Sequence, residues 1–398
     1  MKQWWSTAFS SPPEQKAQPA YGKGAGPQPL IALQLASEAV WTGRNYASLS
    51  RQGYKKNAIA YRCVRLIAEA AASIPFCTRR ENACALKDPV KALLDSGNGG
   101  VSATEIFERF YGYLQLSGNS YLQLSVIEGQ PKALYALRPD RMRSMRGSKG
   151  WTQGWDYEVE GKVQKFRIDN ASGQSAVFHL SLFDPLNETE GYAPMAAASH
   201  AVDIHNAGGR WTKALLDNAA RPSGALIYKG VSGSEHLSDE QFTRLKTELE
   251  GAHSGARNAG RPMVLEGGLD WKAMSFSPAD MDFIAARREA AREIALAFGV
   301  PPMLLGIPGD NSYANYKEAN LAFWRQTIIP LVSKTAKGLE GWLRPFFGDD
   351  LSITPELDQL SALSEERALL WQRLGAVDFI SDDERREIAG LEAVQNGG

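Results

Sequence analysis

The feature that most constrains the fold is a change in the spacing of apolar residues along the chain. Over residues 56–73 and 102–117 they recur every three or four positions, as on helices with one buried face. From Tyr121 the spacing falls to two, as in half-buried strands. Helices therefore precede strands instead of alternating with them. Residues 56 to 185 are predicted to form an α+β unit with a meandering antiparallel sheet.

Two helices open this unit. The first spans 56–73 and ends before Pro75; the second begins at Ser102, which has capping-box spacing to Glu105, and ends at Gly118. The predicted buried faces are Ile59, Cys63, Leu66, Ile67 and Ala70 in the first helix, and Ile106, Phe107, Phe110, Tyr111 and Leu114 in the second. The predicted strands are 121–126, 132–137, 155–159, 163–168 and 176–181.

The second half of the chain returns to helices that bracket a small unit. Pro194 suits a first helical turn, and a helix is predicted from there towards Asn218, with Gly208-Gly209 expected to bend or weaken it. The small unit, residues 223–276, contains predicted strands and one helix. The strands are 225–228, 263–265 and 269–271, and a capping box at Ser238 and Gln241 opens the helix.

Helices also dominate the remainder. One helix is predicted over 279–298, and a loop rich in glycine and proline follows from Gly306 to Tyr313. The helix over 314–347 contains Pro330, which is expected to kink it. Two short helices are predicted in the tail, the second opened by a capping box at Ser381 and Glu384.

Composition narrows the class of protein. The 398 residues are 43% hydrophobic and 22% charged, as in a soluble protein of two to four structural units. The net charge of -1 argues against tight sequence-specific binding of nucleic acid. No segment reads as a signal peptide or a membrane span, and Cys63, Cys77 and Cys84 read as reduced thiols, which predicts a cytoplasmic setting. Residues 1–29 read as a flexible arm, either a tether or a plain leader.

The sequence lacks the usual motifs of catalysis. It contains no GxxxxGK[ST] phosphate loop, no HExxH and no GxSxG, and His200 and His205 are five residues apart, which does not place them on one helix face. We therefore expect no cofactor, no metal and no enzymatic activity.

Charge patterns leave two alternatives open. On the helix 279–298, Glu289 and Glu293 share one stripe beside Arg288 and Arg292, which fits either pairing with a copy of the same helix or a solvated face. A basic stretch precedes Trp151 and Trp155 and fits contact with DNA or an acidic partner, but a solvated sheet edge is favoured. Its members are Arg138, Arg141, Arg143, Arg146 and Lys149.

A series of segments, in order, resembles the portal proteins of tailed phages. The most specific of them is Ile294–Gly306, with the sequence IALAFGVPPMLLG. The others are Asn57–Pro75, Gly118–Leu122, Leu134–Pro139, Val177–Leu180, Gly191–Met195, Ala220–Gly224, Ser312–Tyr316 and Thr327–Pro330. The resemblance runs from about residue 55 to 350 and rests on the order of the series rather than on one motif.

The resemblance implies a portal fold and a dodecameric ring with a central channel for double-stranded DNA. It implies an α/β wing over 30–190, stem helices over 191–220 and 278–298, and a small α/β clip over 221–277. A tunnel loop and long kinked wing helix would span 299–355, and a helical crown 356–398, which is short for the family.

The resemblance also suggests functional residues. The tunnel loop would present Asp310, Asn311, Ser312 and Tyr313 to DNA. Stem-channel or inter-subunit charges would be Lys213, Arg287, Arg288, Glu289 and Arg292, and clip contacts Glu240, Arg244, Arg257 and Asn258.

Expected partners are further copies of the chain, the large terminase subunit, a head–tail adaptor, the major capsid protein and DNA bound without sequence preference, with no membrane. The location would be the portal vertex of a virion, assembled in the bacterial host cytoplasm. The alternatives are another head–tail connector or adaptor component, or an unrecognised α+β enzyme.

Overall fold

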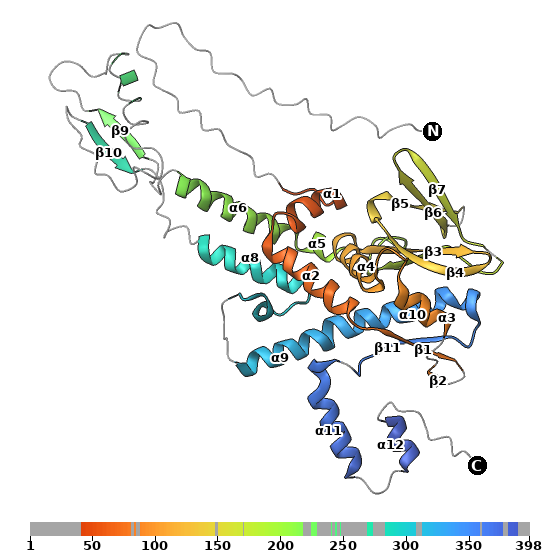
Figure 1. Cartoon of the computed structure of the whole chain (residues 1–398). Helices are drawn as coiled ribbons and strands as arrows, with labels where there is room; N and C mark the ends of the chain where they lie inside the picture. The colour runs from red at the N-terminus through yellow and green to blue at the C-terminus, as the bar shows by residue number, and fades with distance from the viewer. Residues whose placement is uncertain are drawn as a thin grey trace, which may run out of the picture. The chain divides into compact units, whose positions relative to one another are not determined.

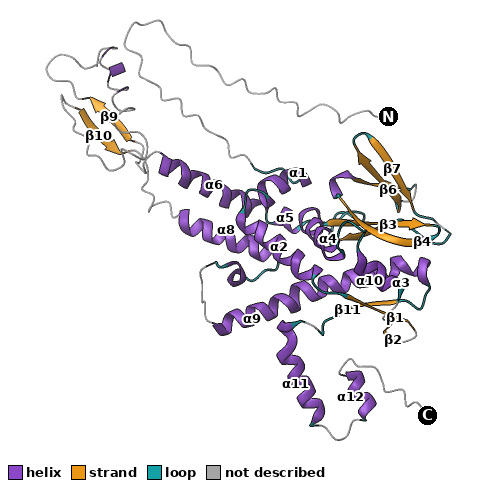
Figure 2. Ribbon diagram, viewed as in Figure 1, coloured by secondary structure: helices purple, strands orange, loops and turns teal. Residues whose placement is uncertain are grey.

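The structure is a computed structural model that mixes helices and strands, as the sequence predicts (Figures 1 and 2). It describes residues 41–80, 83–84, 88–147, 150–169, 171–217, 224–228, 240, 243–244, 247, 269–273, 283–307, 313–358, 360–376 and 381–388. The predicted arm, residues 1–29, lies outside these ranges.

The core is built around α2 (Ala58–Ala72) and α4 (Ala103–Ser117), which pack against each other. The predicted end signals of α4 are confirmed: Ser102 Oγ accepts a hydrogen bond from the Glu105 N–H at 3.2 Å, and Gly118 follows the last turn with φ of 75°. The predicted buried face of α4 is also confirmed. The face predicted for α2 is confirmed only in part: Cys63 and Ile67 are buried, whereas Ile59, Leu66 and Ala70 are half-buried. The other buried residues of α2, which include Ala60, Val64, Ala68 and Ala71, were not predicted.

The physical reason is that α2 has neighbours on more than one side. It contacts α4, α8 (Phe283–Ala297) and η5 (Trp324–Ile328), and its alanines allow these elements to approach closely. A helix buried on several sides has no single apolar stripe for periodicity to find. Before α2 lie the short helical segments α1 (Tyr46–Leu49) and η1 (Ser50–Tyr54).

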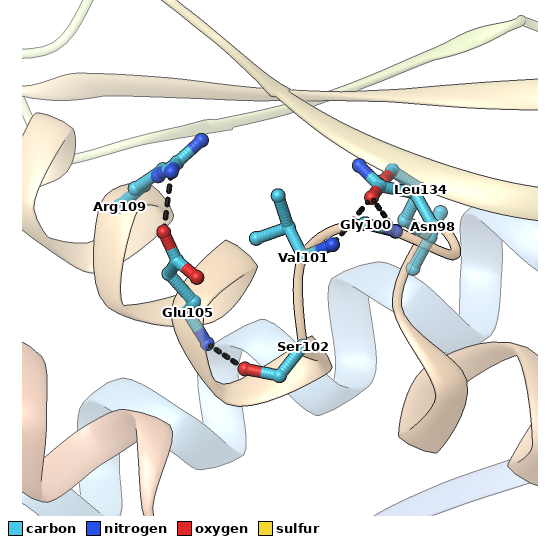
Figure 3. A network of polar contacts seen from close by, with 7 residues as sticks. All are labelled: Asn98, Gly100, Val101, Ser102, Glu105, Arg109 and Leu134. Atoms are coloured by element: carbon cyan, nitrogen blue, oxygen red, sulfur yellow. Dashed lines mark hydrogen bonds and ion pairs between the residues drawn. The ribbon is translucent and has the colours of Figure 1, made fainter.

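The turn before α4 ties the helices to the sheet (Figure 3). Asn98, which follows α3 (Pro89–Ser96), accepts hydrogen bonds at Oδ1 from the Gly100 and Val101 N–H groups, at 3.3 and 3.0 Å. Its Nδ2 donates to the Leu134 carbonyl at 3.4 Å, on β4 (Gln130–Leu137). Arg109 and Glu105 pair one turn apart on α4.

The predicted single meander is wrong, because its strands form two antiparallel sheets. One has the order β4-β3-β8, with β3 (Asn119–Ile127) between β4 and β8 (Val177–Ser181). The other is β5-β6-β7, from Met142–Arg146, Thr152–Val159 and Lys162–Arg167; η2 (Pro139–Arg141) precedes it. A small apolar cluster packs Tyr121 and Val177 of the first sheet with Trp155 and Phe166 of the second.

A third sheet joins distant parts of the chain. β1 (Phe76–Arg80) pairs with β2 (Ala83–Cys84) and, on its other side, with β11 (Ser352–Pro355), with Phe76 opposite Pro355. The sequence did not predict these strands, which are short, and β11 lies far from β1 in the chain. The third sheet attaches the end of the long C-terminal helix to the N-terminal half.

The helix predicted after Gly191 is interrupted. Pro194 begins a short α5 (Pro194–Ala197), and a separate α6 (Ser199–Asp217) follows, so the prediction of one helix is wrong at Ala198. Ser199 donates its hydroxyl to the Ala196 carbonyl at 2.8 Å at this break. α6 runs helically through Gly208-Gly209.

Within the predicted small unit, residues 223–276, the structure describes two strands, β9 (Gly224–Tyr228) and β10 (Leu269–Ala273). They pair antiparallel. Its predicted strand 263–265 and its capping box at Ser238 lie outside the described residues, as does the predicted start of the next helix before α8.

A π-helical turn divides the helix predicted over 314–347 just before Pro330. α9 (Tyr313–Phe323) passes into η5 and then into α10 (Ile329–Phe347), with Pro330 in the first turn of α10. The tail contains η6 (Ser361–Leu363), α11 (Ser364–Gly375) and α12 (Asp382–Ile388), and the capping box of Ser381 and Glu384 is confirmed. Within the described part of the chain, no helix has the length and apolar character to cross a bilayer.

Candidate functional site

The helices α6 and α8 lie side by side (Figure 1), and the side chain of Arg287 on α8 lies against Gly208 on α6. A Cβ atom at Gly208 on α6 would lie 2.8 Å from Arg287 Cγ and 3.0 Å from its Cδ, on α8. A glycine within a helix is destabilising by roughly 0.5–1 kcal/mol relative to alanine. Because Gly208 has no side chain, the aliphatic part of the Arg287 side chain can lie across α6 at this point.

Arg287 lines an open cavity of about 470 Å³ between α2, α6, α8 and η4 (Pro302–Leu305). The polar side chains that line it are His205, Thr212, Arg287 and Arg288; the other lining residues are aliphatic or glycine. The Nε atom of Arg287 is buried and has no hydrogen-bond partner. Two arginines, the half-buried Arg287 and the exposed Arg288, thus line one cavity, and the described part of its lining contains no carboxylate.

Asn57 connects this cavity to the start of α2. It is buried, and its Oδ1 accepts hydrogen bonds from the Ile59 and Ala60 N–H groups, each at 3.0 Å. These backbone donors fix the amide orientation, so Nδ2 is the atom that contacts His205 Nδ1 at 3.2 Å and donates to Asn206 Oδ1 at 3.1 Å. The N-cap of one helix thereby holds the side chains of another.

The same geometry determines the tautomer of His205. Because Asn57 Nδ2 can only donate, His205 Nδ1 must accept, and the ring proton sits on Nε2. Burial lowers the pKa of His205, and the nearby charge of Arg287 lowers it further. The imidazole is therefore neutral and offers an N–H donor beside the two arginines.

The predicted tunnel loop begins at this cavity. Gly306 and Ile307 line it, and Thr327 Oγ1 donates to the Gly299 carbonyl at 2.6 Å, which ties the start of the loop region to η5. Asp310, Asn311 and Ser312 lie outside the described residues. Tyr313 begins α9, but its side chain is outside the description. The structure therefore does not test the predicted DNA contacts of this loop.

The predicted stem charges are distributed around the helix pair. Arg287 and Arg288 share the cavity, whereas Lys213 is exposed on α6. Glu289 and Arg292 pair with each other at 2.6 Å along α8, so part of the predicted charge stripe is satisfied within one helix. Glu240 and Arg244 of the predicted clip set are exposed, and Arg257 and Asn258 lie outside the described residues.

The basic stretch before Trp155 is partly neutralised. Arg138 pairs with Asp140 at 2.7 Å, Arg143 with Glu158 at 3.3 Å, and Arg146 donates to Thr189 Oγ1 at 2.7 Å. Trp155 is buried, whereas Trp151 is 76% exposed. These contacts favour the interpretation as a solvated sheet edge over a DNA-binding face.

A second cavity, of about 550 Å³, lies between η1, α2 and α4 and was not predicted. Its lining mixes tyrosines with charges of both signs, including Lys55, Arg65, Glu105 and Glu108. Arg65 pairs with Glu69, and Arg109 with Glu105. No cluster of three or more histidine, cysteine or carboxylate side chains suited to a metal ion occurs among the residues described.

The chain resembles portal proteins along most of its length. The pattern of the family described as "Phage portal protein" matches residues 58–390. A protein of Rickettsia bellii (strain RML369-C) is 40% identical over 346 residues, which cover 86% of this chain and 89% of the relative. The portal protein of Enterobacteria phage HK97 is 25% identical over 299 residues, 72% of this chain and 66% of that protein.

Chains in solved structures of gene transfer agent (GTA) particles also resemble this chain. In the neck of an empty GTA particle computed with C6 symmetry, a chain 48% identical has a TM-score of 0.71; the match covers 90% of this chain and 98% of that one. In the neck of a native GTA particle computed with C12 symmetry, the TM-score is 0.68 at the same identity, covering 89% and 96%. The chain therefore belongs to the phage portal protein family.

Proposed function

We propose that this chain is the subunit of a dodecameric portal ring at one vertex of a phage or gene transfer agent particle. The ring is the channel through which double-stranded DNA enters during packaging and leaves during ejection. The observation that carries the proposal is the 48% identity, over 89% of the chain, to a component of a particle neck computed with C12 symmetry. Its role is structural, and we assign it no catalytic reaction.

The order of elements supports the predicted division of the chain. The pair α6 and α8 would form the stem, and the segment between them, which contains β9 and β10, would form the clip. The sheets around α2 and α4, with α9 and α10, would form the wing, and α11 with α12 the short crown. A small β unit bracketed by two paired helices is the arrangement expected of a stem that carries a clip at its end.

The charge balance suits a conduit. A duplex carries one negative charge per about 1.7 Å of its axis, so a strongly basic lining would hold it through release of counterions. The chain has a net charge of -1, which favours passage over retention. We propose that Asp310, Asn311, Ser312 and Tyr313 of the tunnel loop make weak contact with the passing duplex without reading its sequence.

Other partners follow from the same proposal. The clip, with Glu240, Arg244, Arg257 and Asn258, would meet the large terminase subunit during packaging and a head–tail adaptor afterwards. The wing would meet the major capsid protein. The charges expected at the channel or between subunits are those of Lys213, Arg287, Arg288, Glu289 and Arg292. The ring would assemble in the host cytoplasm and remain in the virion.

The deciding experiment is native mass measurement and negative-stain imaging of the purified full chain. We expect a closed ring of twelve copies with a central hole wide enough for a duplex. A compact monomer across a range of concentration and salt would contradict the proposal. A closed ring with another number of subunits would agree with the proposed DNA channel but contradict the dodecamer.

A further inference from the structure

The cavity between α6 and α8 contains an arrangement that the fold alone does not require. Arg287 and Arg288 bring two positive charges to it, and neither forms a hydrogen bond or ion pair within the described residues. Elsewhere on α8 an arginine is satisfied locally, as Arg292 is by Glu289 at 2.6 Å. A cation whose Nε is buried without a partner costs free energy that a bound anion would offset.

The position of Arg287 is also fixed in advance. Its Cγ and Cδ occupy the space that a side chain at Gly208 would need, 2.8 and 3.0 Å from the point where a Cβ atom of that residue would lie. Glycine at this position lowers the helix propensity of α6, but it leaves space for the Arg287 side chain. The stem of Arg287 is thus held between two helices, which lowers the entropy that its guanidinium loses on binding a ligand.

The remaining donor comes from α6. His205 accepts at Nδ1 from Asn57 Nδ2, at 3.2 Å, so its Nε2 carries the proton. Thr212 adds no donor, because its hydroxyl is already donated to the Gly208 carbonyl at 2.8 Å. Two arginines of α8, the half-buried Arg287 and the exposed Arg288, therefore line the same cavity as His205 of α6, whose imidazole carries an N–H donor.

We propose that this cavity is an oxyanion site that binds a phosphate group. Donors on two helices suit a tetrahedral anion with several acceptor oxygens better than a planar carboxylate, and guanidinium groups bind phosphate through paired N–H donors. The volume of about 470 Å³ leaves room for the group and its water. The source is either a backbone phosphate of DNA or free phosphate. Only the assignment to DNA rests on the function proposed above.

The test is calorimetric titration of inorganic phosphate into the full chain at constant ionic strength, with chloride as the reference anion. We expect saturable binding that Arg287→Gln weakens by about tenfold or more, because a charge-assisted hydrogen bond is lost. Arg167→Gln removes an exposed arginine on β7 outside the cavity and is the matched control, with binding unchanged. Equal binding by both variants would overturn the proposal.

Gly208→Ala is a second, sharper variant. It keeps every charge and adds one methyl group where Arg287 now lies, so it displaces the guanidinium. We expect phosphate binding to weaken while the helix content is kept. Undiminished binding in Gly208→Ala would mean that phosphate binding depends only on the overall charge of the chain. The proposed site at Arg287 would then be refuted.

A short DNA duplex distinguishes the two sources. If the duplex competes with phosphate for the unaltered chain and not for Arg287→Gln, the site takes a DNA phosphate; phosphate binding without competition assigns it to free phosphate. Native mass of each variant keeps this test separate from the ring. If Arg287→Gln binds phosphate normally but no longer assembles, the cavity instead receives a carboxylate of a second copy, and the phosphate site is rejected.

Discussion

The side chain of Asn119 forms two hydrogen bonds with the backbone of Gly191. Its Oδ1 accepts from the Gly191 N–H at 2.8 Å, and its Nδ2 donates to the Gly191 carbonyl at 3.3 Å. A Cβ at Gly118 would lie 2.3 Å from that carbonyl oxygen, so both glycines are needed for the approach. Two of the segments that resemble portal proteins, Gly118–Leu122 and Gly191–Met195, therefore meet in one junction.

Replacement of Asn119 should destabilise the fold. We expect Asn119→Ala to lower the free energy of unfolding by about 2–4 kcal/mol, because the half-buried backbone groups of Gly191 lose both partners. Denaturant unfolding measures this change. Gln164→Ala, at an exposed position of β7, is the control and should change the value by less than about 0.5 kcal/mol. Equal effects of the two substitutions would show that the junction adds no stability.

His179 should make stability depend on pH. It stacks on Tyr121 with ring centroids 4.5 Å apart, and its Nε2 donates to Asn119 Oδ1 at 3.0 Å. Burial lowers the pKa of His179 to about 4. Between that value and about 6.5 the unfolded chain binds the extra proton, so stability rises with pH over this window and is lost as pH falls towards 4, by up to about 1.4 kcal/mol per pH unit.

The measurement is denaturant unfolding of the full chain at several pH values within that window. Other groups, including the carboxylates and His205, also contribute to the slope, so the comparison is between the unaltered chain and His179→Gln. The variant should be less stable at neutral pH and should have a shallower slope. An unchanged slope in His179→Gln would exclude His179 as its source.

Glu340 should hold β11 against α10. Its carboxylate accepts from the Ile353 N–H at 3.0 Å and pairs with Lys337 at 3.0 Å and Arg344 at 2.8 Å. Burial opposes ionisation of Glu340, but the hydrogen bond from Ile353 and the two cations outweigh it and lower the pKa. We expect Glu340→Ala to cost about 2–4 kcal/mol of unfolding free energy.

Glu318→Ala is the matched control, because Glu318 is exposed on α9. Hydrogen exchange on the full chain adds a local readout. Amides of β11 and of its partner β1 should exchange faster in Glu340→Ala and not in Glu318→Ala. Protection of β11 that survives in Glu340→Ala would contradict this role of the carboxylate.

The tunnel-loop proposal predicts a defect in particles rather than in folding. We expect Asp310→Ala and Tyr313→Ala to reduce the DNA that particles package or retain, because the loop loses its contacts with the duplex. The measurement is nuclease-protected DNA per particle, with ring assembly of each variant checked by native mass. Tyr135→Ala, on the exposed surface of β4, is the control. Normal DNA content in both loop variants would contradict the proposal that this loop contacts DNA.

The sequence by itself determined where several helices begin and end, through capping residues and prolines that act within one or two helical turns. Ser102, Gly118, Pro194 and the pair Ser381 with Glu384 mark helix ends where the sequence predicts them. Such caps depend on residues within three or four positions of each other, so sequence reveals them directly. The order of the motifs likewise pointed to the portal family, to which the chain belongs.

Tertiary structure alone decided which distant segments meet. β1 pairs with β11, Asn119 bonds Gly191, and Gly208 receives Arg287, yet no periodicity marks any of these partners. The sequence indicated Gly208-Gly209 as a weak point of a helix; its partner Arg287 appears only once α6 and α8 are packed. The reason is physical: a local pattern reports which face of an element is apolar, whereas the partner of that face depends on how all the elements pack together.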